Sequence, residues 1–305
     1  MNRRLPHETN IHFVAWTGLE TDLIFNHGVD VPGFASFPLL DQPAARKVIL
    51  DGVLDQMRVV AAAGLGTILE SPTWMANRDR AAPFGYSGDR LVAANRDAIA
   101  LMAEAREKSG SPNILVSGNI GPQGDGYDPA TFLNVAEAQD YHGEQVAAFA
   151  GTKADLVSAY TLTYPAEAIG FVRASKAAGI AAVVSFTVET DGNLVTGQSL
   201  ADAIAETDAA SENGAAYFMV NCAHPDHFRH VLTADPRLKG IIVNASRCSH
   251  AELDEAEELD AGDPMELGDQ VAEITRAFPN IRIVGGCCGT DARHLGEIAK
   301  RVAAT

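Results

Sequence analysis

Three cysteines stand where predicted strands end, and their thiols could bind one metal ion. Cys287 and Cys288 follow the β-branched run 281–284, and Cys222 closes the apolar strand predicted over 217–222. Because the carboxyl ends of strands in α/β folds carry the chemistry, these side chains are expected to converge. A catalytic zinc site has three protein ligands, thiolates among them, and leaves its fourth position to a substrate.

The glycines around the adjacent pair would let both thiols face the same ion. Neighbouring side chains in a regular strand point to opposite faces, so the backbone must turn where the strand ends. Gly285, Gly286 and Gly289 permit that turn because glycine accepts positive φ and close backbone contacts. Asp291 is then the expected N-cap of a closing helix over 292–302.

Two other interpretations of the cysteines remain. They could be small buried residues in a thiol-reducing compartment, or Cys287 and Cys288 could form a reversible redox disulfide. The ring that a vicinal disulfide closes is strained, which disfavours the redox interpretation. Cys248 lies outside both motifs and is predicted not to be a ligand. Four cysteines are too few for a disulfide framework in a chain of this length.

The rest of the chain alternates short β-like runs with helix-like segments. Strands are predicted over 12–16, 67–70, 113–117, 156–162, 181–186, 217–222, 240–244 and from 281. Helices are predicted over 44–63, 91–108, 129–150, 165–178, 199–212, near Phe228, 267–278 and 292–302. Eight such pairs without a linker predict a single (β/α)8 TIM barrel domain over 1–305. An open doubly wound sheet is less favoured, because no GxGxxG follows the first strand.

The cysteine motifs resemble those of a known enzyme family. GGCCGT near the C-terminus and NCxxP about sixty residues earlier are similar to motifs of the zinc-dependent homocysteine S-methyltransferase family, which includes enzymes that use betaine or S-methylmethionine. Segments 18–23, 118–124 and 185–200 resemble further family segments in the same order. The resemblance therefore covers nearly the whole chain.

This resemblance implies a Zn²⁺ cofactor and a methyl transfer. The methyl group would move from a cationic sulfonium or ammonium donor to a zinc-bound thiol, with homocysteine as the leading acceptor and methionine as its product. Three thiolate ligands leave the metal a weak Lewis acid, which suits alkylation of sulfur better than activation of water. Betaine, S-methylmethionine, S-adenosylmethionine and dimethylsulfoniopropionate all stay open as donors.

The departures from the family concern the amino-acid substrate. In the family, an Asp at the end of the first strand and a Glu in the fourth-strand segment help to bind the homocysteine amino group. Trp16 and Leu162 stand at those places here. The loss of such a partner for a buried ammonium costs on the order of several kcal/mol. Glu20 or Glu70 therefore compensates, or the acceptor is another thiol, or the chain is a non-catalytic zinc-binding or regulatory protein.

Other candidate substrate-binding residues lie near the predicted strand ends. Trp16, Trp74 and Tyr164 offer aromatic walls for a cationic donor. Thr163 belongs to the segment that matches the family after the fourth strand. Asn221 precedes the first ligand cysteine and is expected to hydrogen-bond a thiolate or a loop backbone.

Three histidines follow Cys222 at a spacing of three residues. His224, His227 and His230 could share one face of a short helix and suggest a metal site. Because the ligand set implied by the resemblance is complete without them, surface or supporting roles are predicted instead.

Composition limits the partners and the compartment. The net charge of -17 disfavours nucleic acid and anionic membranes. No apolar run approaches the roughly 20 residues that span a bilayer, and no apolar segment follows the basic N-terminus. A cytoplasmic protein is expected, and a homo-oligomer is compatible with the sequence. The acidic run 252–260 is expected to be an exposed helix or loop face.

Overall fold

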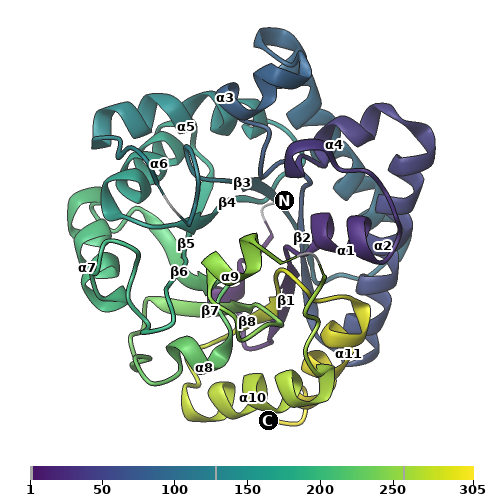
Figure 1. Ribbon diagram of the computed structural model, residues 1–305, viewed down its shortest axis with the longest axis vertical. Helices are drawn as coiled ribbons and strands as arrows, with labels where there is room; N and C mark the ends of the chain where they lie inside the picture. The colour runs from purple at the N-terminus through teal and green to yellow at the C-terminus, as the bar shows by residue number, and fades with distance from the viewer. Residues whose placement is uncertain (1–2, 128, 257) are drawn as a thin grey trace.

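Eight parallel strands form a closed barrel in the computed structural model, which describes residues 3–127, 129–256 and 258–305 (Figure 1). Their order around the barrel is β1 to β8, as in the chain. The strands are β1 Phe13–Trp16, β2 Gly66–Glu70, β3 Ile114–Ile120, β4 Leu156–Leu162, β5 Ala181–Phe186, β6 Ala215–Asn221, β7 Leu238–Val243 and β8 Ile283–Gly286. This architecture confirms the predicted (β/α)8 TIM barrel.

Helices surround the barrel and connect successive strands (Figure 1). They are α1 Leu19–Phe25, α2 Pro43–Ala62, α3 Arg78–Ala81, α4 Gly88–Ser109, α5 Val135–Phe149, α6 Pro165–Ala178, α7 Leu200–Ser211, α8 Pro225–Phe228, α9 His250–Asp254, α10 Pro264–Ala277 and α11 Ala292–Val302. Short 3₁₀ helices span Pro6–Glu8, Pro32–Phe34, Phe37–Asp41 and Ala82–Phe84.

The first strand, β1, pairs with the last, β8, and this pairing closes the barrel. Phe13 lies opposite Ile283, and Trp16 lies opposite Gly286. The N–H of Thr17 donates to the carbonyl of Gly286 at 2.9 Å and continues the ladder by one residue. The first strand therefore ends beside the cysteine pair that follows β8.

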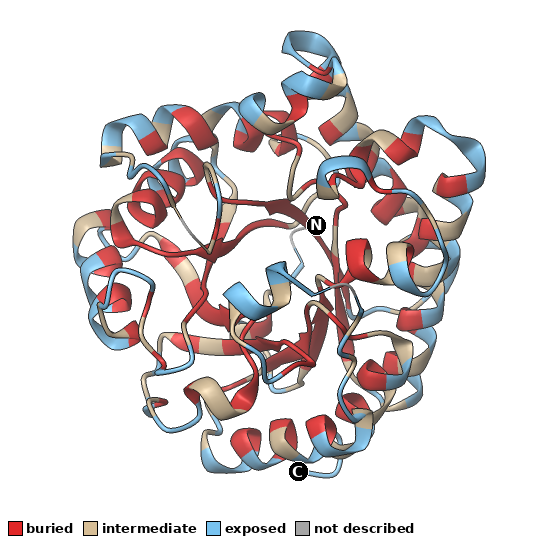
Figure 2. Ribbon diagram, viewed as in Figure 1, coloured by how far each residue is buried: buried red, intermediate tan, exposed pale blue. Residues whose placement is uncertain are grey.

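Two apolar layers hold the barrel. The larger lies between the strands and the helices, and the buried residues follow the strands and the inner faces of the helices in Figure 2. The smaller fills the barrel interior with side chains such as Phe13, Tyr217 and Ile283. Cys222 and Cys287 belong to this interior cluster, so the thiols sit on top of a packed core.

Local signals explain where the helices begin and end. Asp291 accepts a hydrogen bond from the N–H of Arg293 and caps α11, as predicted. The segment predicted as helical from residue 129 becomes regular only at Val135, because Asn134 and Glu137 form a capping box there. The short helices α1, α3 and α9 were not predicted, since four to seven residues carry too little periodicity.

The acidic run lies at the surface, as expected. Residues 254–256 and 258 are exposed, and the first residues of the run belong to α9. Glu257, which belongs to the same run, lies outside the described residues. In the part of the chain that the structure describes, no helix is both long and apolar enough to cross a bilayer.

Candidate metal centre and substrate pocket

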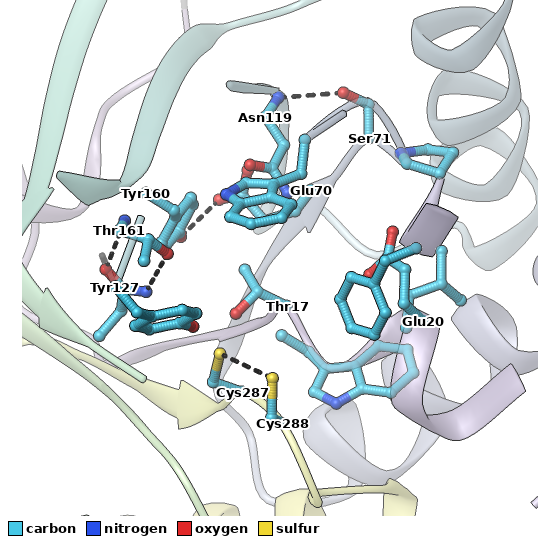
Figure 3. Close-up of a pocket in the computed structure, with 16 residues that line it drawn as sticks. Thr17, Glu20, Glu70, Ser71, Asn119, Tyr127, Tyr160, Thr161, Cys287 and Cys288 are labelled. Carbon is cyan, nitrogen blue, oxygen red and sulfur yellow. Dashed lines mark hydrogen bonds between the residues drawn. The ribbon is translucent and has the colours of Figure 1, made fainter. Parts of the chain in front are cut away.

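The three predicted thiols converge at the ends of β6 and β8. The sulfur of Cys222 lies 2.8 Å from that of Cys287 and 3.6 Å from that of Cys288. The sulfurs of Cys287 and Cys288 are 3.9 Å apart, and both point into the pocket shown in Figure 3. All three cysteines are free thiols, so the structure contains no vicinal disulfide.

The backbone turns after β8 as the glycines predicted. A Cβ on Gly285 would lie 1.7 Å from the carbonyl oxygen of Ala15, so only glycine lets β8 pass β1 this closely. The N–H of Thr290 donates to the carbonyl of Cys287 at 3.1 Å and closes the turn. Both adjacent side chains consequently face one point.

Cys222 adopts an unusual backbone conformation. It follows β6 directly and has φ +56°, a left-handed value that non-glycine residues seldom take. Its N–H still donates to the carbonyl of Ile242 at 2.9 Å. Strain of this kind is typical of functional sites, where the surrounding structure holds a side chain in a required direction.

The sulfur set fits a tetrahedral zinc ion. A Zn–S distance near 2.3 Å places two sulfur ligands about 3.8 Å apart. The Cys222–Cys288 and Cys287–Cys288 separations are close to that spacing. The Cys222–Cys287 pair needs to open by about 1 Å. Among the described residues, this is the one group of three or more Cys, His, Asp or Glu side chains placed to hold a metal ion.

Without a metal, the three thiols share their protons unequally. Hydrogen bonds from Cys287 and then Cys288 hold the pKa of Cys222 well below its ordinary range. The pKa values of Cys287 and Cys288 lie above the ordinary range, mainly because each shares a hydrogen bond with the sulfur of Cys222. The lowered pKa of Cys222 favours its thiolate form, which is the form that binds a metal ion.

A pocket opens beside Cys287 and Cys288 at the carboxyl ends of β1 to β4. Two predicted aromatic residues, Trp16 and Trp74, line it. The indole N–H of Trp16 donates to Thr290, which fixes the ring against the turn after β8. The structure therefore brings both tryptophans to the thiols, and their contact with a substrate stays a prediction.

Glu70 ends β2 and lines this pocket (Figure 3). Its Oε1 accepts a hydrogen bond from the Tyr160 hydroxyl at 2.8 Å. Burial raises the pKa of Glu70 to about 7, and the hydroxyls of Ser117 and Tyr160 limit the rise. At neutral pH this carboxyl is therefore divided between its charged and neutral forms.

Glu70→Gln is expected to change how stability depends on pH. A carboxyl whose pKa is raised on folding stabilises the protein below its unfolded pKa, near 4.5, and loses that contribution as pH rises through 7. Relative to wild type, the free energy of unfolding of the variant should rise by about 3 kcal/mol between pH 4 and 8. Urea denaturation of both proteins across this range checks the difference. A difference that stays constant with pH would contradict the raised pKa.

Glu20, in the first turn of α1, also lines the pocket. Its Oε1 accepts a hydrogen bond from the hydroxyl of Ser36, and burial raises its pKa. The carboxyl already has this internal partner, which gives it a structural role as well as a place beside the thiols. Its role in binding substrate stays a prediction.

Asn221 connects the metal site to the neighbouring strands. Its Oδ1 accepts hydrogen bonds from the N–H of Thr161 at 2.9 Å and the hydroxyl of Ser185 at 2.8 Å. Its Nδ2 donates to the Thr161 hydroxyl at 3.0 Å. Thr161 has φ +64°, so this clamp holds a strained residue at the end of β4. A thiolate or a loop backbone is the predicted partner of Asn221; the observed backbone partner instead belongs to strand β4.

Asn221→Ala should destabilise the fold by about 3 kcal/mol, because the buried Thr161 N–H loses its acceptor and two further bonds disappear. Zinc affinity should also fall, by roughly 10- to 100-fold, since Cys222 follows directly in the chain. Denaturant unfolding and competitive chelation measure the two effects. Ser185→Ala removes only one of the three bonds and should cost about 1 kcal/mol; equal losses in the two variants would contradict the clamp.

Thr163 and Tyr164 lie outside the set of residues that lines the pocket. Tyr164 instead accepts a hydrogen bond from the N–H of Leu133 at 3.0 Å and packs against Phe132. Thr163 is buried after β4. Neither residue lines the pocket beside the cysteines, so their substrate roles stay predictions.

The histidines after Cys222 have other partners than a metal. His224 is buried and caps α8 by accepting the N–H of Asp226. His227 and His230 bond backbone carbonyls of Arg247 and Asp191. Cys248 is exposed and does not belong to the cysteine cluster. The structural roles expected for the histidines and the non-ligand role of Cys248 agree with these positions.

Two residues at the site were not singled out from the sequence. The hydroxyl of Tyr127 donates to the sulfur of Cys222 at 3.1 Å, and its ring lies 4.2 Å from that of His250 in α9. Asn119, on β3, lines the pocket. Tyr127 follows a glycine-rich loop that carries no periodic signal, whereas Asn119 stands in the segment that resembles the family.

The fold and the three-thiol cluster together define a (β/α)8 barrel with side chains that could hold a metal ion at the carboxyl ends of its strands. The family model described as homocysteine S-methyltransferase matches residues 18–302. The chain belongs to the homocysteine S-methyltransferase family.

Individual proteins of related function match the chain at modest sequence identity. Methionine synthase of Mycobacterium tuberculosis is 28% identical over 235 residues, which are 70% of this chain and 18% of that protein, so the chain spans about a fifth of its length. The metallated form of the homocysteine methyltransferase MmuM from Escherichia coli superposes with a TM-score of 0.75 at 21% identity, over 96% of this chain and 97% of that one. Its oxidized form gives 0.77 and 22%, over 97% and 99%. At this identity the likeness establishes the fold.

Proposed function

We propose that residues 1–305 form one domain that transfers a methyl group from a cationic sulfonium or ammonium donor to a thiol bound at zinc. Homocysteine is the leading acceptor, and methionine is then the product. The observation that carries the proposal is the convergence of three sulfurs beside a pocket lined by tryptophans and carboxyl groups. Family membership supports the same activity.

Cys222, Cys287 and Cys288 would hold the zinc. When bound, zinc supplies a thiol ligand that is deprotonated and nucleophilic at neutral pH. Residues of the chain would stabilise the charge of the sulfur ligands. Tyr127 donates its O–H to the sulfur of Cys222 and thereby stabilises negative charge on it.

The pocket walls suit a cationic methyl donor. Trp16 and Trp74 present indole rings, and aromatic faces attract cations in sites that exclude water. The guanidinium of Arg80 lies 5.2 Å from the Trp74 ring centre and orients that indole. Because the opposite charges of a cationic donor and a thiolate partly cancel in the transition state, a dry pocket favours the transfer.

Trp16 and Leu162 replace the two acids that the family resemblance implies for binding the substrate amino group. Leu162 is fully buried and does not line the pocket, so it cannot pair with a substrate ammonium group. The carboxyl groups available beside the thiols are those of Glu20 and Glu70. We propose that they take part in substrate binding.

The direct test combines metal analysis with a product screen. Zinc-loaded protein is mixed with homocysteine or another small thiol and with betaine, S-methylmethionine, dimethylsulfoniopropionate or S-adenosylmethionine. Mass spectrometry should detect a methylated thiol for at least one pair, and methionine when homocysteine accepts. Binding of one zinc per chain without turnover for any pair would instead favour a non-catalytic zinc-binding protein.

The remaining partner assignments follow from this proposal. The partners are a small thiol and a small methyl donor, and the strong negative charge argues against nucleic acid. A cytoplasmic location suits reduced thiols. Size measurement in solution would test whether the chain forms a homo-oligomer.

A further inference from the structure

The pocket beside the cysteines contains two buried acceptor atoms without a donor. Asn119 is 6% exposed, and its Oδ1 has no hydrogen-bond partner. The Oε2 of Glu70 is likewise buried and makes no hydrogen bond of normal geometry. The nearby hydroxyls of Ser117 and Ser158, which limit the rise of the Glu70 pKa, bond each other at 2.9 Å. Both side chains line the pocket that Cys287 and Cys288 also line. Because unsatisfied buried acceptors are costly, such a pair at a pocket wall indicates a ligand that supplies the donors.

Hydrogen bonds from neighbouring residues hold Glu70 and Asn119 in place but do not involve these two side-chain oxygens. The N–H of Asn119 donates to the Ser71 hydroxyl at 3.0 Å, and the Thr73 hydroxyl donates to the Asn119 carbonyl at 2.7 Å. The other carboxylate oxygen of Glu70 already accepts from Tyr160. The loop after β2 is therefore hydrogen-bonded to β3, and Glu70 and Asn119 line the pocket from these two adjacent strands (Figure 3).

The charge of the pocket selects the kind of donor. Two carboxyl groups, those of Glu20 and Glu70, line it, and the described residues of its wall include no Lys, Arg or His. A cation with several N–H donors satisfies both the charge and the two oxygens. A quaternary ammonium or a dimethylsulfonium group carries charge but no N–H, so it leaves both acceptors unpaired.

We propose that Glu70 Oε2 and Asn119 Oδ1 form a subsite for a primary ammonium group, which selects amino-bearing substrates for this active site. This inference rests on the proposed function and names the substrate class more closely. It moves amine recognition to β2 and β3, away from the positions of Trp16 and Leu162. The ammonium can belong to the thiol acceptor or to an amino-acid sulfonium donor.

Calorimetric titration of the zinc-loaded protein distinguishes these two sources. One arm compares homocysteine with 4-mercaptobutyrate, and the other compares S-methylmethionine with 4-(dimethylsulfonio)butyrate. Within each arm the two compounds differ only in the amino group. In at least one arm, wild type should prefer the amino compound by about 10- to 100-fold, the range expected of a charged hydrogen bond.

Glu70→Gln and Asn119→Ala should each bring that preference down to a few-fold while the des-amino compound binds as before. Glu104→Gln makes the same chemical change on the outer face of α4 and should leave the preference intact. Equal binding within both arms of wild type, or an unchanged preference in the two pocket variants, would overturn the inference. Because binding needs no turnover, a retained preference without methyl transfer would support the subsite and count against the proposed activity alone.

Discussion

Cys287→Ala is expected to lose the bound zinc and, with it, the methyl transfer. The variant keeps only two of the three sulfurs that converge at the ends of β6 and β8. Replacement of residues that merely support a metal ligand typically costs 10- to 100-fold, so loss of a ligand should lower the rate by more than about 100-fold. After mild chelation, zinc content should fall from about one ion per chain to nearly none.

Cys248→Ala is the matched control for this prediction. It removes a thiol that is exposed and outside the cluster, and zinc content and rate should both match wild type. Circular dichroism and thermal unfolding show whether either variant has lost its fold. A Cys287→Ala protein that keeps stoichiometric zinc through chelation would contradict the three-thiol site.

Gly285→Ala should be the most damaging single change to stability. Its Cβ would lie 1.7 Å from the carbonyl oxygen of Ala15 and 2.8 Å from that residue's carbonyl carbon. These are backbone atoms of β1, which cannot rotate away as a side chain could. The contact opens the closure between β1 and β8 and should lower the free energy of unfolding by more than about 4 kcal/mol. Urea denaturation of purified protein measures the loss.

Gly52→Ala is the opposite case in the same chain. Gly52 lies at a partly exposed position of α2 with no atom within 4 Å of an added Cβ. Alanine should stabilise this helix by roughly 0.5 to 1 kcal/mol. A loss of less than about 1 kcal/mol in the free energy of unfolding of Gly285→Ala would contradict the claim that the close contact between β8 and β1 requires glycine.

The barrel could be predicted because its signals are local and repeated. Each strand is a largely apolar run that contains Val or Ile. Long helices have a stop or start residue such as Gly179 or Asp291. The short helix α1 had no comparable signal, since no side chain caps it at Gly18. Elements without capping residues or periodicity are fixed by tertiary packing, which the sequence does not display.

The convergence of the three thiols could be predicted because they follow strand ends and glycines. A cysteine at the end of a barrel strand must lie at the face where the carboxyl ends of the strands meet. Three such cysteines are therefore expected to lie close together. Pocket residues such as Glu70 and Trp74 were found for the same reason. Thr163 and Tyr164 also follow a strand but lie outside the pocket lining, because the irregular end of β4 at Thr161 changes which side chains face the centre.

Amine recognition could not be predicted in the same way. The relevant property of Asn119 is an oxygen that its neighbours leave unpaired, and that depends on hydrogen bonds from residues about 46 positions earlier. Tyr127 reaches Cys222 across 95 positions of sequence. Only a structure brings together the donors that satisfy some atoms and leave others for a substrate.

X-ray absorption at the zinc edge tests the central claim most directly. Zinc-loaded protein should show three sulfur scatterers near 2.3 Å, and a fourth should appear when a saturating thiol acceptor is added. The Cys287→Ala protein should show no such shell after chelation. A zinc coordinated mainly by nitrogen or oxygen, or a sulfur count that does not rise with thiol, would contradict a three-thiolate centre with an open substrate position.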